Sequence, residues 1–212
     1  MELDSIRREY RSGQLSRADL LDSPFDQFEK WLQFAVDTEI QDPTAMCLAT
    51  VDEDGRPSQR TVLLKQLDAT GLTFFTNLES RKALDIKGNA AVSLHFTWLQ
   101  LNRQVAVEGL AEKLPLTSVL KYFISRPRES QFAAWASPQS RPVDSRSILD
   151  SEFSRMRQKF SQGDVPLPSF WGGYRIIPQQ WEFWQGSVNR LHDRFQYRKS
   201  AEGQWAIARL AP

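Results

Sequence analysis

The chain has 212 residues, of which 41% are hydrophobic and 25% are charged, a composition typical of a folded globular protein. Lys and Arg together number 27 and Asp and Glu 26, and the formal net charge of +1 disfavours a dedicated nucleic-acid-binding protein, because such proteins usually carry a strong basic excess. A single cysteine, Cys47, excludes an internal disulfide, and with only two histidines in the chain we expect no metal site.

The N-terminal segment shows no targeting signal. Residues 1–5 lack a basic start followed by an apolar run, and no later stretch approaches the roughly 20 apolar residues of a membrane span. The single cysteine suits a reducing compartment, so we expect a cytoplasmic protein without membrane association. Residues 6–20 are polar and charge-rich. We therefore predict a flexible N-terminal arm over residues 1–20, followed by a single domain over residues 21–212.

The domain begins with a helix and continues mainly as short strands. Ser23 and Pro24 have the residue types of an N-cap and a first helical position, and five apolar residues follow at helical spacing: Phe25, Phe28, Trp31, Leu32 and Ala35. Strand-like segments separated by turn residues cover residues 45–51, 58–67, 72–76, 91–96 and 104–114, and a short helix is expected at residues 81–87.

Helices and a second group of strands complete the predicted order. Helices are expected at residues 116–125, 129–136 and 144–160, and strands at residues 174–177, 181–184, 194–197 and 204–209. Both ends of the chain thus supply strands, with helices inserted between them. We predict a mostly-β, α+β fold: an antiparallel barrel with peripheral and inserted helices.

Several cationic side chains are placed where an anion would stabilise them. If Ser80 is the N-cap of its helix, Arg81 and Lys82 lie in the first turn, where cations oppose the helix dipole but favour a bound anion. A solvated charged turn is an equally good interpretation. Arg60 and Lys65 bracket an apolar run, but strand alternation puts them on opposite faces unless a bulge intervenes. From these residues alone, a strand with solvated ends is the better interpretation.

Two other sets of polar residues could complete a phosphate site. Tyr122, Arg126 and Ser130 are spaced by four residues, but Pro127 biases Arg126 toward an extended backbone. They could converge around a phosphate at a helix junction, but two helices that merely meet at a proline are an equally good interpretation. Gln139 and Ser140 lie in a polar loop, where their side chains could bind a phosphate or could simply face solvent.

The segment Arg190-Leu191-His192-Asp193-Arg194 is the strongest candidate. In an extended strand, Arg190, His192 and Arg194 share one face, where three potentially cationic groups repel one another unless an anion compensates them. Histidine also titrates near neutral pH. We therefore predict that this segment belongs to a functional site.

Taken in order, these segments resemble the pyridoxine/pyridoxamine 5'-phosphate oxidase family. The resemblance runs through nearly the whole chain, and no single motif carries it alone. It includes Asp42-Pro43-Thr44-Ala45-Met46, Thr76-Asn77, Ser125-Arg126-Pro127-Arg128, Phe170-Trp171-Gly172-Gly173, Phe183-Trp184-Gln185-Gly186 and the ending Arg209-Leu210-Ala211-Pro212. The resemblance implies an FMN-binding split β-barrel that forms a homodimer with FMN at the subunit interface.

The resemblance also implies roles for individual residues. The implied FMN contacts are Arg60, Thr61, Val62, Leu63, Leu64, Lys65, Phe75, Thr76, Arg81, Lys82, Gln104, Gln139, Ser140, Trp184 and Arg194, the first six partly through the backbone. The implied substrate contacts are Lys65, Tyr122, Arg126 and Ser130 at the phosphate, and Arg190, Leu191 and His192 at the ring. Arg190 and His192 are the implied catalytic pair, and Arg7 and Tyr10 belong to an arm that can cover the site.

The implied reaction oxidises pyridoxine 5'-phosphate or pyridoxamine 5'-phosphate to pyridoxal 5'-phosphate. A hydride passes from C4' of the substrate to N5 of FMN, and O2 then reoxidises the flavin and yields hydrogen peroxide. Three alternatives stay open from the sequence: a split-barrel flavoprotein with another substrate, a non-catalytic module that binds FMN or pyridoxal 5'-phosphate, and a nucleic-acid-binding barrel.

Overall fold

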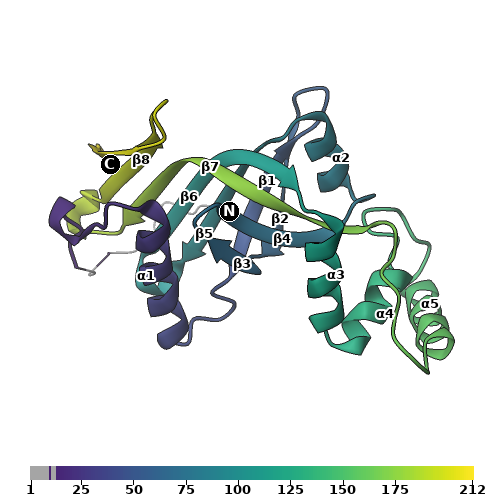
Figure 1. Cartoon of the computed structure of the whole chain (residues 1–212). Helices are drawn as coiled ribbons and strands as arrows, with labels where there is room; N and C mark the ends of the chain where they lie inside the picture. The colour runs from purple at the N-terminus through teal and green to yellow at the C-terminus, as the bar shows by residue number, and fades with distance from the viewer. Residues whose placement is uncertain (1–9, 11–12) are drawn as a thin grey trace, which may run out of the picture.

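The alternating strands form one antiparallel sheet of nine strands in the computed structural model, which describes Tyr10 and residues 13–212 (Figure 1). The main path of the sheet runs β2-β1-β5-β6-β7-β4-β3, and β8 and β9 continue from β7. The predicted mostly-β fold is confirmed. The strands are β1 (Ala45–Val51), β2 (Pro57–Leu63), β3 (Gln66–Asp68), β4 (Gly71–Asn77), β5 (Ala91–Trp98), β6 (Arg103–Lys113), β7 (Trp171–Gln185), β8 (Asp193–Lys199) and β9 (Trp205–Leu210).

The long strand β7 joins the two halves of the sheet. Its first half pairs with β4 and its second half with β8, while β6 lies along its other edge. The register with β6 shifts between Glu108 and Gly109, opposite Pro178. An extra residue at such a bulge accommodates a proline, which has no N–H for the ladder. The two strands predicted at residues 174–177 and 181–184 are therefore one continuous strand.

Helix α1 (Pro24–Asp37) covers one face of the sheet and supplies much of the main core. The Ser23 hydroxyl accepts a hydrogen bond from the Asp26 N–H, which confirms the predicted N-cap. The Phe28 ring lies 4.7 Å from the ring of Phe96, and the Trp31 ring lies 5.3 Å from that of Phe183. Burial of each such ring contributes about 1.5–3 kcal/mol, so the apolar face of α1 fixes this helix to the sheet.

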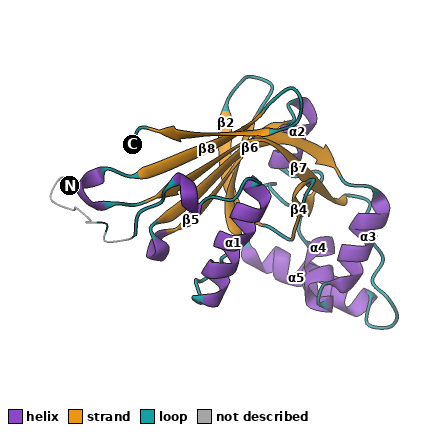
Figure 2. Cartoon of the chain, turned by 60° about the vertical axis from the view of Figure 1, so that its left-hand side comes forward, coloured by secondary structure: helices purple, strands orange, loops and turns teal. Residues whose placement is uncertain are grey.

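Three further helices gather at one end of the sheet (Figure 2). They are α3 (Leu116–Ser125), α4 (Arg128–Ala136) and α5 (Arg146–Lys159), and they enclose a second hydrophobic cluster that includes Phe123, Phe132 and Met156. Helix α2 (Arg81–Gly88) directly follows β4. The inserted helices predicted at residues 81–87, 116–125, 129–136 and 144–160 are thus confirmed, with boundaries that differ by one or two residues.

The described part of the N-terminal segment packs against the rest of the chain. Leu15 and Leu20 are buried in the main core, and a short 3-10 helix, η1 (Arg17–Asp19), lies between them. The Leu15 N–H donates to the Asp193 carboxylate at 2.9 Å. Arg7 lies outside the described residues, and the flexibility of the arm and its boundary at residue 20 stay predictions. Within the described residues, no helix has the length and apolar composition needed to cross a membrane.

Candidate active site

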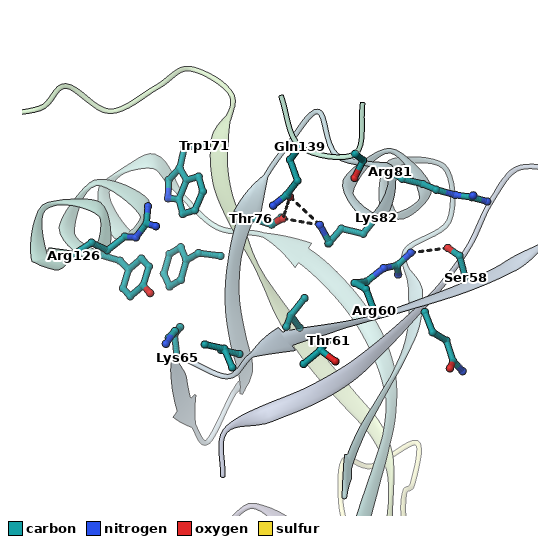
Figure 3. Close-up of a pocket in the computed structure, with 16 residues that line it drawn as sticks. Ser58, Arg60, Thr61, Lys65, Thr76, Arg81, Lys82, Arg126, Gln139 and Trp171 are labelled. Atoms are coloured by element: carbon teal, nitrogen blue, oxygen red, sulfur yellow. Dashed lines mark hydrogen bonds between the residues drawn. The ribbon is translucent and has the colours of Figure 1, made fainter. Parts of the chain in front are cut away.

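A cavity of about 660 Å³ lies between β2, β4, the start of α2 and the junction of α3 with α4 (Figure 3). Among the described residues that line it, five side chains are cationic and none is a carboxylate. The lining residues are Ser58, Gln59, Arg60, Thr61, Val62, Leu63, Lys65, Phe75, Thr76, Arg81, Lys82, Tyr122, Arg126, Gln139, Ser140 and Trp171. The excess of cationic side chains over carboxylates in the lining makes this cavity a candidate site for anions.

Lys82 marks one end of the cavity. Its ammonium donates to Gln139 Oε1 at 2.9 Å and to the Thr76 hydroxyl at 3.2 Å (Figure 3). It also donates to the Ser80 hydroxyl at 3.2 Å. All three acceptors are neutral, and the side chain is buried. Burial and the nearby charge of Arg60 lower the pKa of Lys82 to about 8. A phosphate at this end would supply the negative charge that the protein itself does not place beside Lys82.

Arg60 reaches the same end from β2 and is held by a hydrogen-bond network. It donates to the Thr50 hydroxyl at 2.7 Å and to the Ser58 hydroxyl at 2.6 Å. The buried Asp85 carboxylate accepts from the same two hydroxyls and lies 3.8 Å from the Arg60 guanidinium. Burial lowers the pKa of Arg60, and the Asp85 charge partly opposes that effect. This network fixes the guanidinium at the wall of the cavity.

The start of α2 brings Arg81 and Lys82 to the cavity, as an anion site at this helix end requires. Ser80 has the extended backbone of an N-cap residue, but its hydroxyl donates to the Asn77 carbonyl at 2.7 Å instead of capping the helix. Arg81 is exposed and lies 3.5 Å from the Asp52 carboxylate. The expected N-cap position of Ser80 is confirmed, although its hydroxyl bonds to the preceding turn and does not cap the helix.

Arg126 marks the other end of the cavity (Figure 3). Helix α3 ends at Ser125, and Pro127 follows Arg126 in the chain. Arg126 has the extended backbone predicted for a residue that precedes proline, with φ −74° and ψ 148°. Its guanidinium lies 4.3 Å from the ring centre of Trp171, and its buried Nη1 has no hydrogen-bond partner among the residues that the structure describes. Burial lowers the pKa of Arg126, and the neighbouring Tyr122 partly opposes that effect. The Tyr122 ring stacks on Phe75 at 3.7 Å.

The edge strand β2 forms one wall between the two ends. Within the described sheet, β2 pairs only with β1, so half of its backbone N–H and C=O groups point away from the sheet. The strand ends at Leu63, and Leu64 turns inward and is buried. This break brings both Arg60 and Lys65 to the cavity, which the simple alternation of one long strand could not do. The strand predicted at residues 58–67 is therefore two strands, β2 and β3.

A second group of expected site residues lies away from this cavity. Gln104, Trp184, Arg190, Leu191, His192 and Arg194 are absent from its lining. They belong to β6, β7, β8 and the turn between β7 and β8, at the end of the sheet opposite α3 (Figure 1). The His192 ring lies 4.7 Å from the ring of Trp184 and 5.1 Å from that of Tyr10. Trp184 and His192 thus cluster with Tyr10 away from the cavity.

The predicted shared face of Arg190, His192 and Arg194 is wrong. Strand β8 begins only at Asp193, and Arg190 belongs to a 3-10 turn, where its φ of 60° lies in the left-handed region. Arg194 does not need an external anion, because its guanidinium donates to both carboxylate oxygens of Glu182, at 2.8 and 3.1 Å. The three side chains therefore occupy three different environments, and the His192 Nδ1 accepts a hydrogen bond from the Ser187 N–H at 3.2 Å.

Of the other predicted site residues, some line the cavity and some do not. Ser130 lies in the first turn of α4 and does not line the cavity, although Tyr122 and Arg126 do. Gln139 and Ser140 line it, which favours the phosphate interpretation of their loop. Three lining residues, Ser58, Gln59 and Trp171, were not among the predicted contacts. Trp171 was part of a motif shared with the family but had no assigned role, and the pairing of β7 with β4 brings it to the cavity.

Comparisons with known families cover most of the chain. Residues 32–160 match the family described as "Pyridoxamine 5'-phosphate oxidase", and residues 171–212 match the one described as "Pyridoxine 5'-phosphate oxidase C-terminal dimerisation region". Curated relatives named pyridoxine/pyridoxamine 5'-phosphate oxidase include those of Pseudoalteromonas translucida and Hahella chejuensis. Each is 58% identical to this chain, and each alignment covers 100% of both chains.

Solved structures show the same fold. PhzG from Burkholderia lata, in complex with tetrahydrophenazine-1-carboxylic acid, matches with a TM-score of 0.89 and 27% identity over 95% of this chain and 99% of that chain. An FMN-binding protein from Nostoc punctiforme, described as related to pyridoxamine 5'-phosphate oxidase, has a TM-score of 0.72 and 16% identity over 90% of this chain and 98% of that chain. This second match bears on the fold alone.

Proposed function

Because the chain belongs to the pyridoxamine 5'-phosphate oxidase family, we propose that it oxidises pyridoxine 5'-phosphate and pyridoxamine 5'-phosphate to pyridoxal 5'-phosphate with FMN as its cofactor. One observation carries the proposal: a single cavity has two cationic ends and no carboxylate among its described lining residues. Cofactor and substrate each carry one phosphate, so two separate cationic ends match the two ligands.

The residues of the Lys82 end fit the FMN phosphate. Lys82 is buried among neutral acceptors, Arg81 and Arg60 add two further charges, and Gln139 is hydrogen-bonded to Lys82. The outer edge of β2 offers backbone donors and acceptors, which suit the polar rim of a planar ring. We therefore assign FMN to this end and to the β2 wall.

The residues of the Arg126 end fit the phosphate of the substrate. Arg126 has a buried donor without a partner, and Lys65 and Tyr122 line the cavity beside it. Two anchored phosphates would hold the substrate carbon against the cofactor ring, and this fixed orientation is itself a large contribution to catalysis. When bound, FMN supplies the acceptor for the hydride that leaves C4' of the substrate.

The second group of residues would act on the cavity of a partner subunit. Trp184, Arg190, His192 and Arg194 fall within the segment that matches a dimerisation region, and they do not line the cavity of their own chain. We propose a homodimer in which Arg190 and His192 orient the substrate ring across the interface. Tyr10 contacts the Trp184 and His192 rings, so the N-terminal segment would cover the same place.

Two further elements of the proposal come from the sequence. Oxygen is the proposed final electron acceptor, with hydrogen peroxide as the second product. The single cysteine supports a reducing, cytoplasmic location.

Turnover by the FMN-loaded protein tests this function. We expect aldehyde and hydrogen peroxide in equal amounts from pyridoxine 5'-phosphate and from pyridoxamine 5'-phosphate. Protein that binds FMN but leaves both phosphates unchanged would instead be a flavoprotein with another substrate or a non-catalytic module. Protein that FMN cannot reconstitute would contradict both the cofactor and the reaction.

A further inference from the structure

Trp171 lines the cavity without a role in the proposed function, and its indole ring lies against Arg126. The guanidinium carbon of Arg126 is 4.3 Å from the indole centre and 5.9 Å from the ring centre of Phe123. Both distances are within the range of about 6 Å for an attraction between a cation and an aromatic face, and the indole is the stronger partner. The Arg126 side chain is therefore held mainly by the face of Trp171.

The backbone of Arg126 is fixed by other residues. Pro127 imposes the extended conformation, and the buried amide of Gln131 donates to the Arg126 carbonyl at 2.9 Å and to the Phe123 carbonyl at 3.2 Å. These contacts hold the main chain at the helix junction. They do not orient the guanidinium, so a change at Trp171 can alter the side chain without moving the backbone.

An aromatic partner leaves an arginine free to bind an anion. A carboxylate would accept hydrogen bonds from up to two of the five guanidinium N–H donors and would neutralise the positive charge. An aromatic face leaves both the donors and the charge available. Arg60 and Arg81 each lie near a carboxylate, while no carboxylate among the described residues forms an ion pair with Arg126. Its buried Nη1 still lacks an acceptor.

The indole N–H of Trp171 is another unsatisfied group at this end of the cavity. Trp171 Nε1 is buried and has no hydrogen-bond partner among the described residues, and a buried donor without an acceptor destabilises the folded state. The core residue Trp181 also has such an Nε1, but Trp171 differs from it because Trp171 lines the cavity and faces the Arg126 guanidinium.

We propose that Trp171 is a positioning residue for the phosphate of the substrate. Its indole face orients the Arg126 guanidinium and leaves the donors of Arg126 available for the phosphate. This inference rests on the proposed function, because it assigns the Arg126 end of the cavity to the substrate.

Substitution of Trp171 should affect substrate binding selectively. A contact between a cation and an aromatic face is worth about 0.5–2 kcal/mol, so Trp171→Leu should raise the KM for pyridoxine 5'-phosphate about 2- to 30-fold. We expect the Kd for FMN to change less than about twofold, because Lys82 and Gln139 lie at the other end of the cavity (Figure 3). Trp171→Phe keeps an aromatic face and should restore part of the affinity.

A double-mutant cycle shows whether Trp171 acts through Arg126. Arg126→Met removes the cation, and Trp171→Leu should then add almost nothing, because the indole has no cation left to orient. Trp135→Leu is the matched control. Trp135 packs against the same small hydrophobic cluster, but its Nε1 donates to the Pro166 carbonyl at 2.8 Å and it does not line the cavity. This control should leave the KM unchanged.

Three results would overturn the inference: equal KM increases in Trp171→Leu and Trp135→Leu, additive losses in the double variant, or no KM change in Trp171→Leu. A wild-type protein that oxidises neither phosphate would contradict the proposed function instead. In that case calorimetric titration of the same variants with pyridoxal 5'-phosphate decides the inference. A selective loss of affinity in Trp171→Leu supports it, and unchanged affinity refutes it.

Discussion

Lys82 is expected to lower the stability of the cofactor-free protein, and its replacement by methionine tests this. Burial and Arg60 lower the pKa of Lys82 from 10.5 to about 8, and a shift of that size corresponds to about 3 kcal/mol against the charged form. Methionine fills similar space without charge but loses three hydrogen bonds to neutral acceptors. We therefore expect Lys82→Met to raise the free energy of unfolding of the FMN-free protein by about 1–2 kcal/mol at pH 7.

The pH dependence of this gain follows from the lowered pKa. Below pH 8 Lys82 is charged in both the folded and the unfolded state, so the full cost of burying the charge is present. Between pH 8 and 10.5 the folded protein loses the proton first, and the cost diminishes as the pH rises. The advantage of Lys82→Met should therefore shrink over this interval.

Denaturant unfolding of the FMN-free protein at pH 7 and at pH 9.5 measures both effects, and quenching of flavin fluorescence gives the Kd for FMN. We expect a more stable protein that binds FMN at least tenfold more weakly. A loss of stability at pH 7 would refute the argument from burial. An unchanged Kd would refute the placement of the FMN phosphate at Lys82.

Three other substitutions probe separate parts of the structure. Gln131→Leu leaves the carbonyls at the end of α3 without their amide donor and should lower the free energy of unfolding by about 1–3 kcal/mol in denaturant titration. An unchanged value would mean that water replaces the amide. Asp85→Asn removes the charge beside Arg60 and should change FMN affinity more than it changes the KM for pyridoxine 5'-phosphate. Equal changes in the Kd for FMN and in the KM would show that Asp85 affects both ends of the cavity. Arg190→Met should reduce turnover far more than FMN retention, and parallel losses would mean that Arg190 holds the cofactor.

The helix boundaries were predictable because they depend on residues that are adjacent in the sequence. Ser23 and Pro24 mark the start of α1 by capping chemistry, and Pro127 separates α3 from α4 through its effect on the preceding residue. The continuity of β7 was not predictable, because Pro178 is tolerated only through a bulge in the pairing with β6. That pairing joins segments far apart in the sequence.

The site was predictable in part for the same reason. The first turn of α2 pointed to an anion at Arg81 and Lys82, and both line the cavity. The strand predicted through Arg190 was wrong because Arg190 has a left-handed backbone, and no glycine at this position indicates that conformation in the sequence. Trp171 stands in a motif shared with the family, but its place in the site could not be predicted because β-sheet pairing brings its indole ring to Arg126.

The central claim is that one cavity binds two phosphates at two distinct cationic ends. The most direct test compares Lys82→Met and Arg126→Met in the same two assays, the Kd for FMN and the KM for pyridoxine 5'-phosphate at saturating FMN. We expect a crossed pattern: Lys82→Met raises the Kd for FMN with little effect on the KM, and Arg126→Met raises the KM with little effect on the Kd. If both variants change both constants alike, the cavity does not have two separate phosphate sites.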